Sequence, residues 1–543
     1  MSATQDEKLY ARLTHIISET NGLSLLDTLT LLNGAQTLPS DTKKAVEDFL
    51  RLLNEYRTTE SDIQPLLNHP VGRAFHRFFK NFPLRYREEH IHLTGSLTAE
   101  FIYPRLKKLL EGPNKDRYEK QITLVYGEKA LPINNVEDVD RLIRLPEGEK
   151  FNRYLEILLL AKLILVDRKA HEEAAYHLAE SLWDNYNIGA IRLKFSLSRA
   201  TTRETEKIPG TENVTPEDVV LGLYTGLKEF QKHHPDFQFI LSPCFRKEED
   251  FFDGERFKNK REDFDHQVQQ LRDLLAKYPE LRKSIVEVDT VGSESNLFRK
   301  SHFQVMKVGF RKLQSEGIKI RSHHGETWGT LRQGIQSVDN AMNIWHVDAI
   351  EHGLSLGINP NFYFHSIFQR VMGNNRKGLP IKVHSLEYRE IDQMDFGKKD
   401  HIKGKLFNGE PLSDEEFTVF IKTKFHVARE IEHYQHDILN RMIDKALSVI
   451  ALPSSNKKLT GQFEDYKDHP FSWWEKKGVK LGVGTDNYIT LNTDYIKEML
   501  ILLFTDSIDL KITKLLLVCT GDSRRPYISQ KLWDMRKQTP LLE

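Results

Sequence analysis

Apolar positions in the first 80 residues recur at helical spacing. The segments LLDTLTLLN and VEDFLRLLNEY both show this pattern, which predicts amphipathic helices. Neither segment carries residues in a pattern typical of a catalytic or metal site. We therefore expect residues 1–80 to form an N-terminal helical extension with a structural or interface role.

Beyond residue 80, short apolar runs of strand length alternate with longer amphipathic stretches. Strands rich in Val, Ile and Leu that alternate with helices favour a parallel sheet, and eight of them favour a closed barrel. Nearly every run ends in His, Asp, Glu, Ser or Gly, as expected where strand ends form an active site. The predicted fold class is therefore α/β, a (β/α)8 TIM barrel with helical additions. The eight runs lie at residues 90–95, 188–197, 237–244, 284–292, 317–326, 347–353, 447–455 and 479–486.

Two intervals between the runs are too long for a single barrel helix. The stretch between the first and second runs is long and helical, and residues 354–446 end in one or two long helical patterns. Insertions at such loops lie over the mouth of a barrel. We expect 354–446 to be a mostly helical insertion that serves as a lid or a subunit contact. The barrel then occupies residues 81–353 and resumes in 447–543, which also holds C-terminal helices.

Composition excludes several classes of protein. The chain has 78 Lys+Arg and 78 Asp+Glu, so charge gives no argument for a nucleic-acid or membrane surface. Two cysteines, Cys244 and Cys519, are too few for a disulfide scaffold or a thiolate-rich zinc site. The N-terminus lacks the pattern of a signal peptide, and the most apolar stretch, 154–166, is too short and too charged to span a bilayer. A cytoplasmic protein is expected.

Candidate chemistry stands at the ends of the predicted strands. His90 and His92 are two apart, so both imidazoles project from one side of a strand and can reach one metal ion. Among 22 histidines such a pair alone is a weak signal. At the end of the fifth run, His323 and His324 point to opposite sides, and Glu326 beyond them is a candidate general acid or base. The alternative there is a charged turn that opens a helix.

The sixth and eighth runs end in EHG (351–353) and GTDN (484–487). Alone, His352 is more simply a structural histidine, and Asp486 is more simply a helix cap. Together with the other motifs, three histidines and Asp486 from strand ends one, five and eight make a mixed nitrogen and oxygen ligand set. Zinc favours such a set and lowers the pKa of bound water to about 7. Glu326 and His352 remain beside it as acid/base groups.

With these motifs in this order, the sequence resembles the adenosine deaminase branch of the amidohydrolases. The resemblance covers residues 82–350 and 447–490. It implies a zinc-dependent hydrolase of purine metabolism that releases ammonia from a 6-aminopurine nucleoside or a derivative. It also implies one Zn²⁺ per chain, with another divalent metal as the alternative, and a small-molecule purine-type substrate. The motifs that carry it are PLRYREEHIHLTGS, VEVDTVGSES, SHHGE, EHG, ALPSSNKKLTG, His469-Pro470 and KKGVKLGVGTDN.

The resemblance also implies a role for each residue of the site. Glu326 would donate a proton to the purine ring, and His352 would be the partner of the attacking water. Gly292 would contact the substrate ring through its backbone. His324 stands at the family's alanine position, and we expect it to face the neighbouring loop. The implied metal ligands are His90, His92, His323 and Asp486.

Two positions depart from the family pattern. Thr94 and Asn487 stand where the family usually has an aspartate that contacts the sugar and an aspartate that reaches the purine five-membered ring. A site without these carboxylates is less hostile to a negative substituent. We therefore expect altered activity on adenosine and better activity on a sugar-modified derivative, such as a phosphorylated one.

The same departures keep two other functions open. One is another amidohydrolase reaction on a different aminated substrate. The other is a barrel used mainly for binding or assembly, with the extension or the insertion as the contact surface of a homo-oligomer. No nucleic acid or membrane partner is expected in either case.

Overall fold

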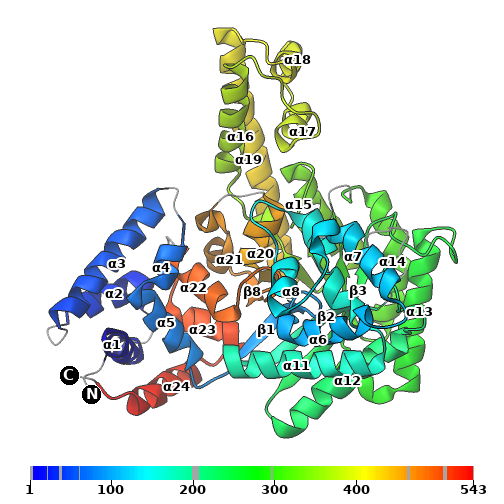
Figure 1. The fold of residues 1–543 in the computed structure, drawn as a ribbon. Coiled ribbons are helices and arrows are strands. Elements are labelled where there is room, and N and C mark those ends of the chain that lie inside the picture. Colours follow the sequence, from blue (N-terminus) through cyan, green and yellow to red (C-terminus); the bar gives the residue numbers. More distant parts are fainter. Residues whose placement is uncertain are drawn as a thin grey trace.

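The computed structural model of the chain describes residues 4–20, 23–35, 39–59, 62–197, 207–294, 297–461, 465–505 and 510–541. Eight parallel strands form one sheet in the order of the chain (Figure 1). Backbone hydrogen bonds from His92 N to Asp486 O (2.8 Å) and from Asp486 N to His90 O (2.9 Å) join the last strand to the first. The predicted (β/α)8 barrel is confirmed. The strands are β1 Tyr86–His92, β2 Ile188–Ser196, β3 Gln238–Arg246, β4 Glu287–Val291, β5 Lys319–His324, β6 Ala349–His352, β7 Ser448–Ala451 and β8 Lys480–Val483.

Helices surround the barrel because parallel strands must be covered on their outer side. Most of these helices begin at a short polar residue whose side chain accepts a backbone N–H, which satisfies the first turn. Thr215 and Thr330 do so in capping boxes, and Asp167 and Asn259 do so alone. The helices are α11 Arg168–Tyr186, α12 Pro216–His233, α13 Lys260–Lys277, α14 Lys300–Ser315 and α15 Leu331–Asn340, with the short η3 Pro279–Lys283 and η4 Ala341–Trp345.

The long segment between β1 and β2 adds short helices above the carboxyl ends of the first strands. Tyr154, Leu158, Leu459 and Leu491 form a small apolar cluster of their own, which ties this segment to the loops after β7 and β8. The segment is thereby held close to the barrel mouth. Its helices are α6 Ala99–Leu110, α7 Lys115–Tyr126, η1 Glu128–Ala130, α8 Val136–Ile143, α9 Phe151–Ile157 and α10 Leu159–Leu163.

The N-terminal helices pack with the C-terminal helices in one lobe beside the barrel, where both chain ends lie (Figure 1). His15 Nε2 is 2.7 Å from the Thr539 carbonyl oxygen, and Ser24 forms an antiparallel bridge with Lys511. The N-terminal extension therefore packs against the C-terminal segment of the chain. The lobe consists of α1 Gln5–Glu19, α2 Leu25–Asn33, α3 Ser40–Thr58, α4 Gln64–Asn68, α5 Pro70–Lys80, α22 Tyr495–Thr505, α23 Ile512–Thr520 and α24 Arg525–Gln538.

Residues 354–446 form a helical arm that projects away from the barrel (Figure 1). α19 has 31 residues, which corresponds to a length of roughly 46 Å. At its base, Gln435 Nε2 donates to the carbonyl oxygens of Ser355 and Ile358, both at 2.9 Å. The helices are η5 Leu354–Leu356, α16 Pro360–Asn375, α17 Leu386–Gln393, η6 Gly397–Lys399, α18 His401–Asn408 and α19 Asp414–Asp444.

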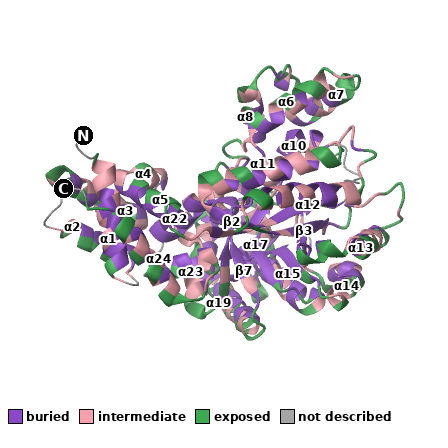
Figure 2. Ribbon diagram, turned by 90° about the horizontal axis from the view of Figure 1, so that it is seen from below, coloured by how far each residue is buried: buried purple, intermediate pink, exposed green. Residues whose placement is uncertain are grey.

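The strands and the inward sides of the helices are buried, whereas the outer helix faces are exposed (Figure 2). Four short helices flank the last two strands: α20 Pro453–Ser455, η7 Asn456–Thr460, η8 Tyr466–Asp468 and α21 Phe471–Lys477. Within the described ranges, no helix has both the length and the apolar character needed to cross a membrane.

Candidate active site at the strand ends

Four side chains converge at the carboxyl ends of β1, β5 and β8. The Nε2 atom of His92 lies 3.2 Å from His90 Nε2 and 3.4 Å from His323 Nε2. Asp486 Oδ1 lies 3.5 Å from His92 Nε2 and 3.8 Å from His90 Nε2. Ligand atoms about 2.1 Å from a tetrahedral zinc ion are about 3.4 Å apart. The ligand atoms of His90, His92 and Asp486 are therefore close enough together for one divalent ion, and His323 adjoins this group through His92.

Two carboxylates orient the histidines from behind. His90 Nδ1 is 2.7 Å from Glu351 Oε2, and His323 Nδ1 is 3.2 Å from Asp289 Oδ1. Such bonds place the ring proton on Nδ1 and leave Nε2 as the free ligand atom. No role for Glu351 or Asp289 was predicted from the sequence. The available signal was a carboxylate directly before His352 and another inside the fourth apolar run.

Burial sets the protonation states that a metal site needs. It lowers the pKa of His92 to about 3, and it lowers the pKa of His90 and of His323 well below the usual value. The three imidazoles are therefore neutral, as metal ligands must be. At Asp486, by contrast, burial opposes the ionised state that a ligand needs, because it raises the pKa to about 7; Ser455 Oγ donates to Oδ2 at 2.6 Å and counteracts that rise.

His352 lies beside this group. Its ring centre is 5.5 Å from that of His90 and 5.1 Å from that of His323, so it could form a second, overlapping ligand set with them. Its Nε2, however, also faces Glu326 Oε1 at 3.7 Å, and its Nδ1 is 2.8 Å from Asn456 Oδ1. The Asn456 contact fixes the proton on Nδ1 and leaves Nε2 as a base.

His323 and His324 point in opposite directions, as strand alternation requires. His324 Nδ1 hydrogen-bonds Ser322 Oγ at 2.6 Å, and the ring packs 5.4 Å from both Phe303 and Trp345. His324 therefore faces the helices α14 and η4 and not the neighbouring loop that we expected. The reason is that its side of β5 is covered by these helices.

Glu326 is almost fully buried in the loop after β5. Burial raises its pKa well above the usual range, and the nearby charges of Asp486 and Glu294 act in the same direction. Glu294 holds the loop, because its carboxylate accepts the backbone N–H groups of Gly325, Glu326 and Thr327 at 2.9, 2.5 and 2.7 Å. Glu326 is thus fixed in position, and its surroundings favour the protonated carboxyl. No role for Glu294 was predicted from the sequence, although it belongs to the motif VEVDTVGSES.

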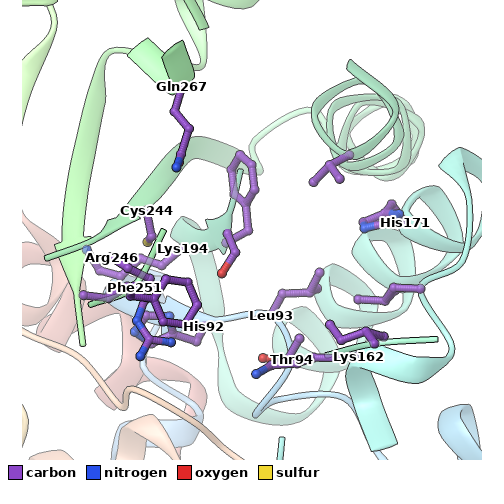
Figure 3. A pocket seen from close by; sticks show the side chains of 16 residues that line it. His92, Leu93, Thr94, Lys162, His171, Lys194, Cys244, Arg246, Phe251 and Gln267 are labelled. Atoms are coloured by element: carbon purple, nitrogen blue, oxygen red, sulfur yellow. The ribbon is translucent and has the colours of Figure 1, made fainter. Parts of the chain in front are cut away.

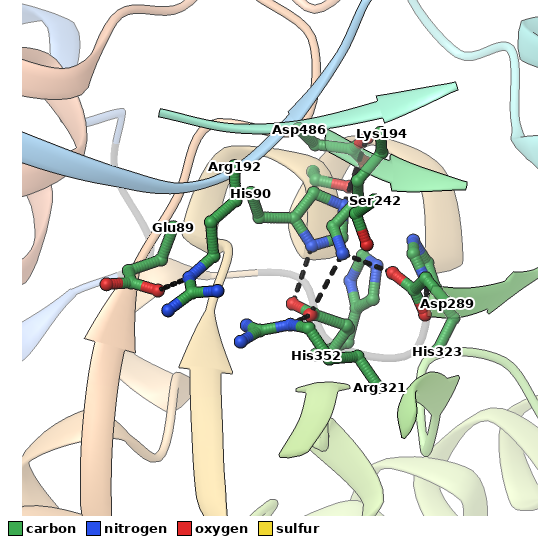
Figure 4. Close-up of polar contacts among 12 residues, drawn as sticks. Glu89, His90, Arg192, Lys194, Ser242, Asp289, Arg321, His323, His352 and Asp486 are labelled. Carbon is green, nitrogen blue, oxygen red and sulfur yellow. Dashed lines mark hydrogen bonds and ion pairs between the residues drawn. The ribbon is translucent and has the colours of Figure 1, made fainter. Parts of the chain in front are cut away.

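A network of buried charges supports the histidines from inside the barrel (Figure 4). Lys194 Nζ pairs with Asp289 and lies 3.0 Å from Glu351 Oε1, which Arg321 Nε approaches at 2.5 Å. Burial alone would raise the pKa of Glu351, but Arg321 and Lys194 together hold that pKa well below its usual range. Glu351 is therefore ionised and able to accept the His90 ring proton.

A chamber of about 110 Å³ lies beside the cluster and is lined in part by His92 (Figure 3). Among the described residues that line it, His92 belongs to the cluster and Thr94 stands beside it, and no Asp or Glu is present. Lys162 and Arg246 also line the chamber; Arg246 pairs with Glu248 at 2.7 Å. The lining therefore carries cations. Glu248, which is not a lining residue, neutralises part of the charge of Arg246.

The two remaining candidate substrate residues, Gly292 and Asn487, follow β4 and β8. Gly292 has φ +100°, and a side chain there would meet the Glu248 carboxylate at 2.0 Å. Asn487 is fully buried, and its amide faces Asp486 and Tyr154. Ser295, the last residue of the motif around Gly292, lies outside the described residues.

No protein-family model matches this chain, and no curated protein matches it. The solved structures to which the chain is similar include deaminases and an amidohydrolase.

Adenine deaminase from Arthrobacter aurescens is 12% identical, with a TM-score of 0.48 over 84% of this chain and 99% of that one. N6-methyl-AMP deaminase from Arabidopsis thaliana is 12% identical, with a TM-score of 0.47 over 85% and 98%. An amidohydrolase from Burkholderia ambifaria, solved with bound Zn, is 12% identical, with a TM-score of 0.47 over 86% and 95%.

Proposed function

We propose that this chain is a metal-dependent hydrolase that deaminates a 6-aminopurine nucleoside or a derivative. The observation that carries the proposal is the set of four ligand atoms from three strand ends, with Glu326 and His352 next to it. One divalent ion, preferably zinc, would be held by the ligand set His90, His92, His323 and Asp486. That ion would supply Lewis acidity, which lets water lose a proton near neutral pH.

The residues beside the ligands suit hydrolytic deamination. His352 Nε2, unprotonated and buried, takes the proton of the attacking water. The water oxygen forms a bond to the amine-bearing ring carbon, and Glu326 gives its proton to the adjacent ring nitrogen. The carbon–nitrogen bond to the amino group then breaks as His352 passes the water proton to that nitrogen, and ammonia leaves. The hydroxyl proton of the adduct returns to Glu326, and the ring nitrogen keeps the proton that it received. Each group has the protonation state that its step requires.

The chamber suggests which derivative fits best. Thr94 presents a neutral hydroxyl at the position where the sugar is expected, and the cations Lys162 and Arg246 lie farther along the lining. A negative group on the sugar would meet no carboxylate among the described lining residues. We infer that a phosphorylated 6-aminopurine nucleoside is a better substrate than adenosine itself.

The test is ammonia release by the metal-loaded protein from adenine, adenosine, deoxyadenosine and their phosphorylated relatives. We expect turnover of purines, with the best kcat/KM for a phosphorylated one. If adenosine is clearly the best substrate, the inference about the chamber is wrong. If no purine reacts and another amine or amide does, the deaminase proposal itself is wrong.

A further inference from the structure

The loop that carries Glu326 is held from two sides. We call residues 325–330, which join β5 to α15, the acid loop. From the barrel, the Glu294 carboxylate accepts the backbone N–H groups of its first three residues. The helical arm contacts the stretch of chain that follows. Glu326 therefore lies close to the point where the two sets of contacts meet.

Tyr363 on α16 joins the acid loop to the arm through its hydroxyl group. Trp328 Nε1 donates to Tyr363 Oη at 3.3 Å, and both side chains are almost fully buried. The hydroxyl in turn donates to Glu390 Oε1 on α17 at 2.7 Å. The same carboxylate oxygen accepts from the backbone N–H of Leu331, the first residue of α15, at 2.6 Å. This chain of hydrogen bonds links both ends of the segment 328–331 to the arm.

A second arm residue holds the middle of that segment. Arg389 Nε on α17 donates to the Gly329 carbonyl oxygen at 3.0 Å. Arg389, Thr327 and Trp328 also line a cavity of about 260 Å³ on this side of the acid loop. Side chains that border a cavity lack packing partners there, so packing alone does not fix the loop on this side. The hydrogen bonds from Tyr363 and Arg389 therefore restrict its movement.

The position of Glu326 depends on this restraint. Its carboxyl group faces His352 Nε2 at 3.7 Å, and it has to stay within hydrogen-bond distance of the substrate ring to deliver a proton. A misplacement of about 1 Å can cost about 10²-fold in rate. Trp328 is only two residues from Glu326, so movement of the segment that the arm holds would also move the acid.

We propose that the helical arm holds the catalytic acid in place, with Tyr363 and Arg389 as positioning residues that act on Glu326 through the acid loop. This inference rests on the proposed function, in which Glu326 is the proton donor. Neither positioning residue lines the chamber beside His92, so neither is expected to bind the substrate there. The arm is then a support of the active site, a role distinct from that of a lid or a subunit contact.

The test measures kcat and KM of the metal-loaded protein for its best 6-aminopurine substrate. Tyr363→Phe and Arg389→Met each remove one of the hydrogen bonds to the acid loop. Both variants should keep the bound metal and KM, whereas kcat should fall by roughly ten- to a hundredfold because the acid is misplaced. Arg389 is only partly buried, so Arg389→Met keeps the test available if Tyr363→Phe does not fold.

Two variants of the same kind are matched controls. Tyr434 and Arg441 on α19 also join the arm to α15, but they contact Asp339 near the other end of that helix, at 3.2 and 2.9 Å. Tyr434→Phe and Arg441→Met should therefore leave kcat unchanged. If they lower kcat as much as the first pair does, any loosening of the arm has this effect, and the assignment of Tyr363 and Arg389 is overturned.

A double-variant cycle shows whether the effect passes through Glu326. In Glu326→Gln the acid is absent, so adding Tyr363→Phe or Arg389→Met should change the remaining kcat by less than about twofold. A full further loss there would overturn the inference, as would parental kcat in both single variants, and the proposed function would stand in either case. If the metal-loaded parent turns over no purine at all, the proposed function fails, and this inference fails with it.

Discussion

Burial determines the protonation states of the two proton-transfer groups, Glu326 and His352. Both are almost completely removed from solvent, which raises the pKa of the carboxyl well above its usual value and lowers that of the imidazole to about 4. Near neutral pH, Glu326 is therefore an acid and His352 a base. Two groups whose environments shift their pKa values in opposite directions suit an acid–base pair.

Replacement of Glu326 tests its role as an acid. Glu326→Gln should keep the metal and the fold but lose about 10²- to 10⁴-fold in kcat, because an amide cannot supply the proton. Since the pKa of Glu326 is raised, its protonated form is the active one, and kcat/KM of the parent should fall as the pH rises through that pKa. This alkaline fall should be absent in the variant. Near-parental turnover by Glu326→Gln would exclude the role.

The adjacent histidines give a test of metal ligation. His323→Ala should lose the bound ion because its Nε2 faces the cluster, as elemental analysis of the purified protein can measure. His324→Ala should keep the ion but unfold more easily, since its ring packs against Phe303 and Trp345. Metal loss from His324→Ala alone would contradict the ligand assignment.

At the scale of elements, a buried carboxyl group is one of the contacts that join the helical arm to the barrel. Glu390 on α17 accepts from Leu331 N at 2.6 Å and from the Tyr363 hydroxyl at 2.7 Å. Burial raises its pKa from 4.5 to about 7. Because the pKa of Glu390 is raised in the folded state, its protonated carboxyl contributes its full stabilisation below pH 4.5. This stabilisation is lost as the pH rises through about 7.

Glu390→Gln should remove this pH dependence, because an amide keeps the acceptor oxygen without a charge. Above pH 7 the variant should be more stable than the parent by up to about 3 kcal/mol, since one unit of pKa corresponds to about 1.4 kcal/mol. Urea unfolding at pH 5 and pH 8 measures it. Glu387→Gln on the same helix is the control, because Glu387 pairs with Arg370 at 2.6 Å and its pKa is lowered. An equal gain in both variants would contradict the account.

The sequence predicted the elements better than the contacts between them. The alternation of apolar runs and helices gave the eight strands, because period and residue type are local properties. The carboxylates of Asp289 and Glu351 behind the histidines were not predicted, since their roles depend on which strands face one another across the barrel. The contact between Tyr154 and Asn487 was not predicted for the same reason, because α9 reaches the loop after β8 only through tertiary packing.

At the scale of the whole molecule, the proposed metal site joins the first and the last strand of the barrel. His90 and Asp486 are neighbours because the barrel closes between β1 and β8. An ion that binds only the folded state adds about 2.7 kcal/mol of stability at a free concentration 100 times its Kd. The predicted homo-oligomer through the extension or the arm stays a prediction.

Removal of the ion should therefore weaken the fold. Dialysis against a chelator should lower the Tm of the parent, and added Zn²⁺ should restore it. Asp486→Ala should show little response to either treatment, because one ligand is missing. If the Tm of the parent changes neither with the chelator nor with added Zn²⁺, a metal site that joins β1 and β8 is contradicted.

The most direct test of metal-dependent deamination is ammonia release from the best 6-aminopurine substrate while Zn²⁺ is titrated into metal-free protein. We expect the activity to rise in proportion to bound metal until one ion is bound per chain. Asp486→Ala should stay inactive throughout. Ammonia release that is independent of the metal, or that persists in Asp486→Ala, would contradict it.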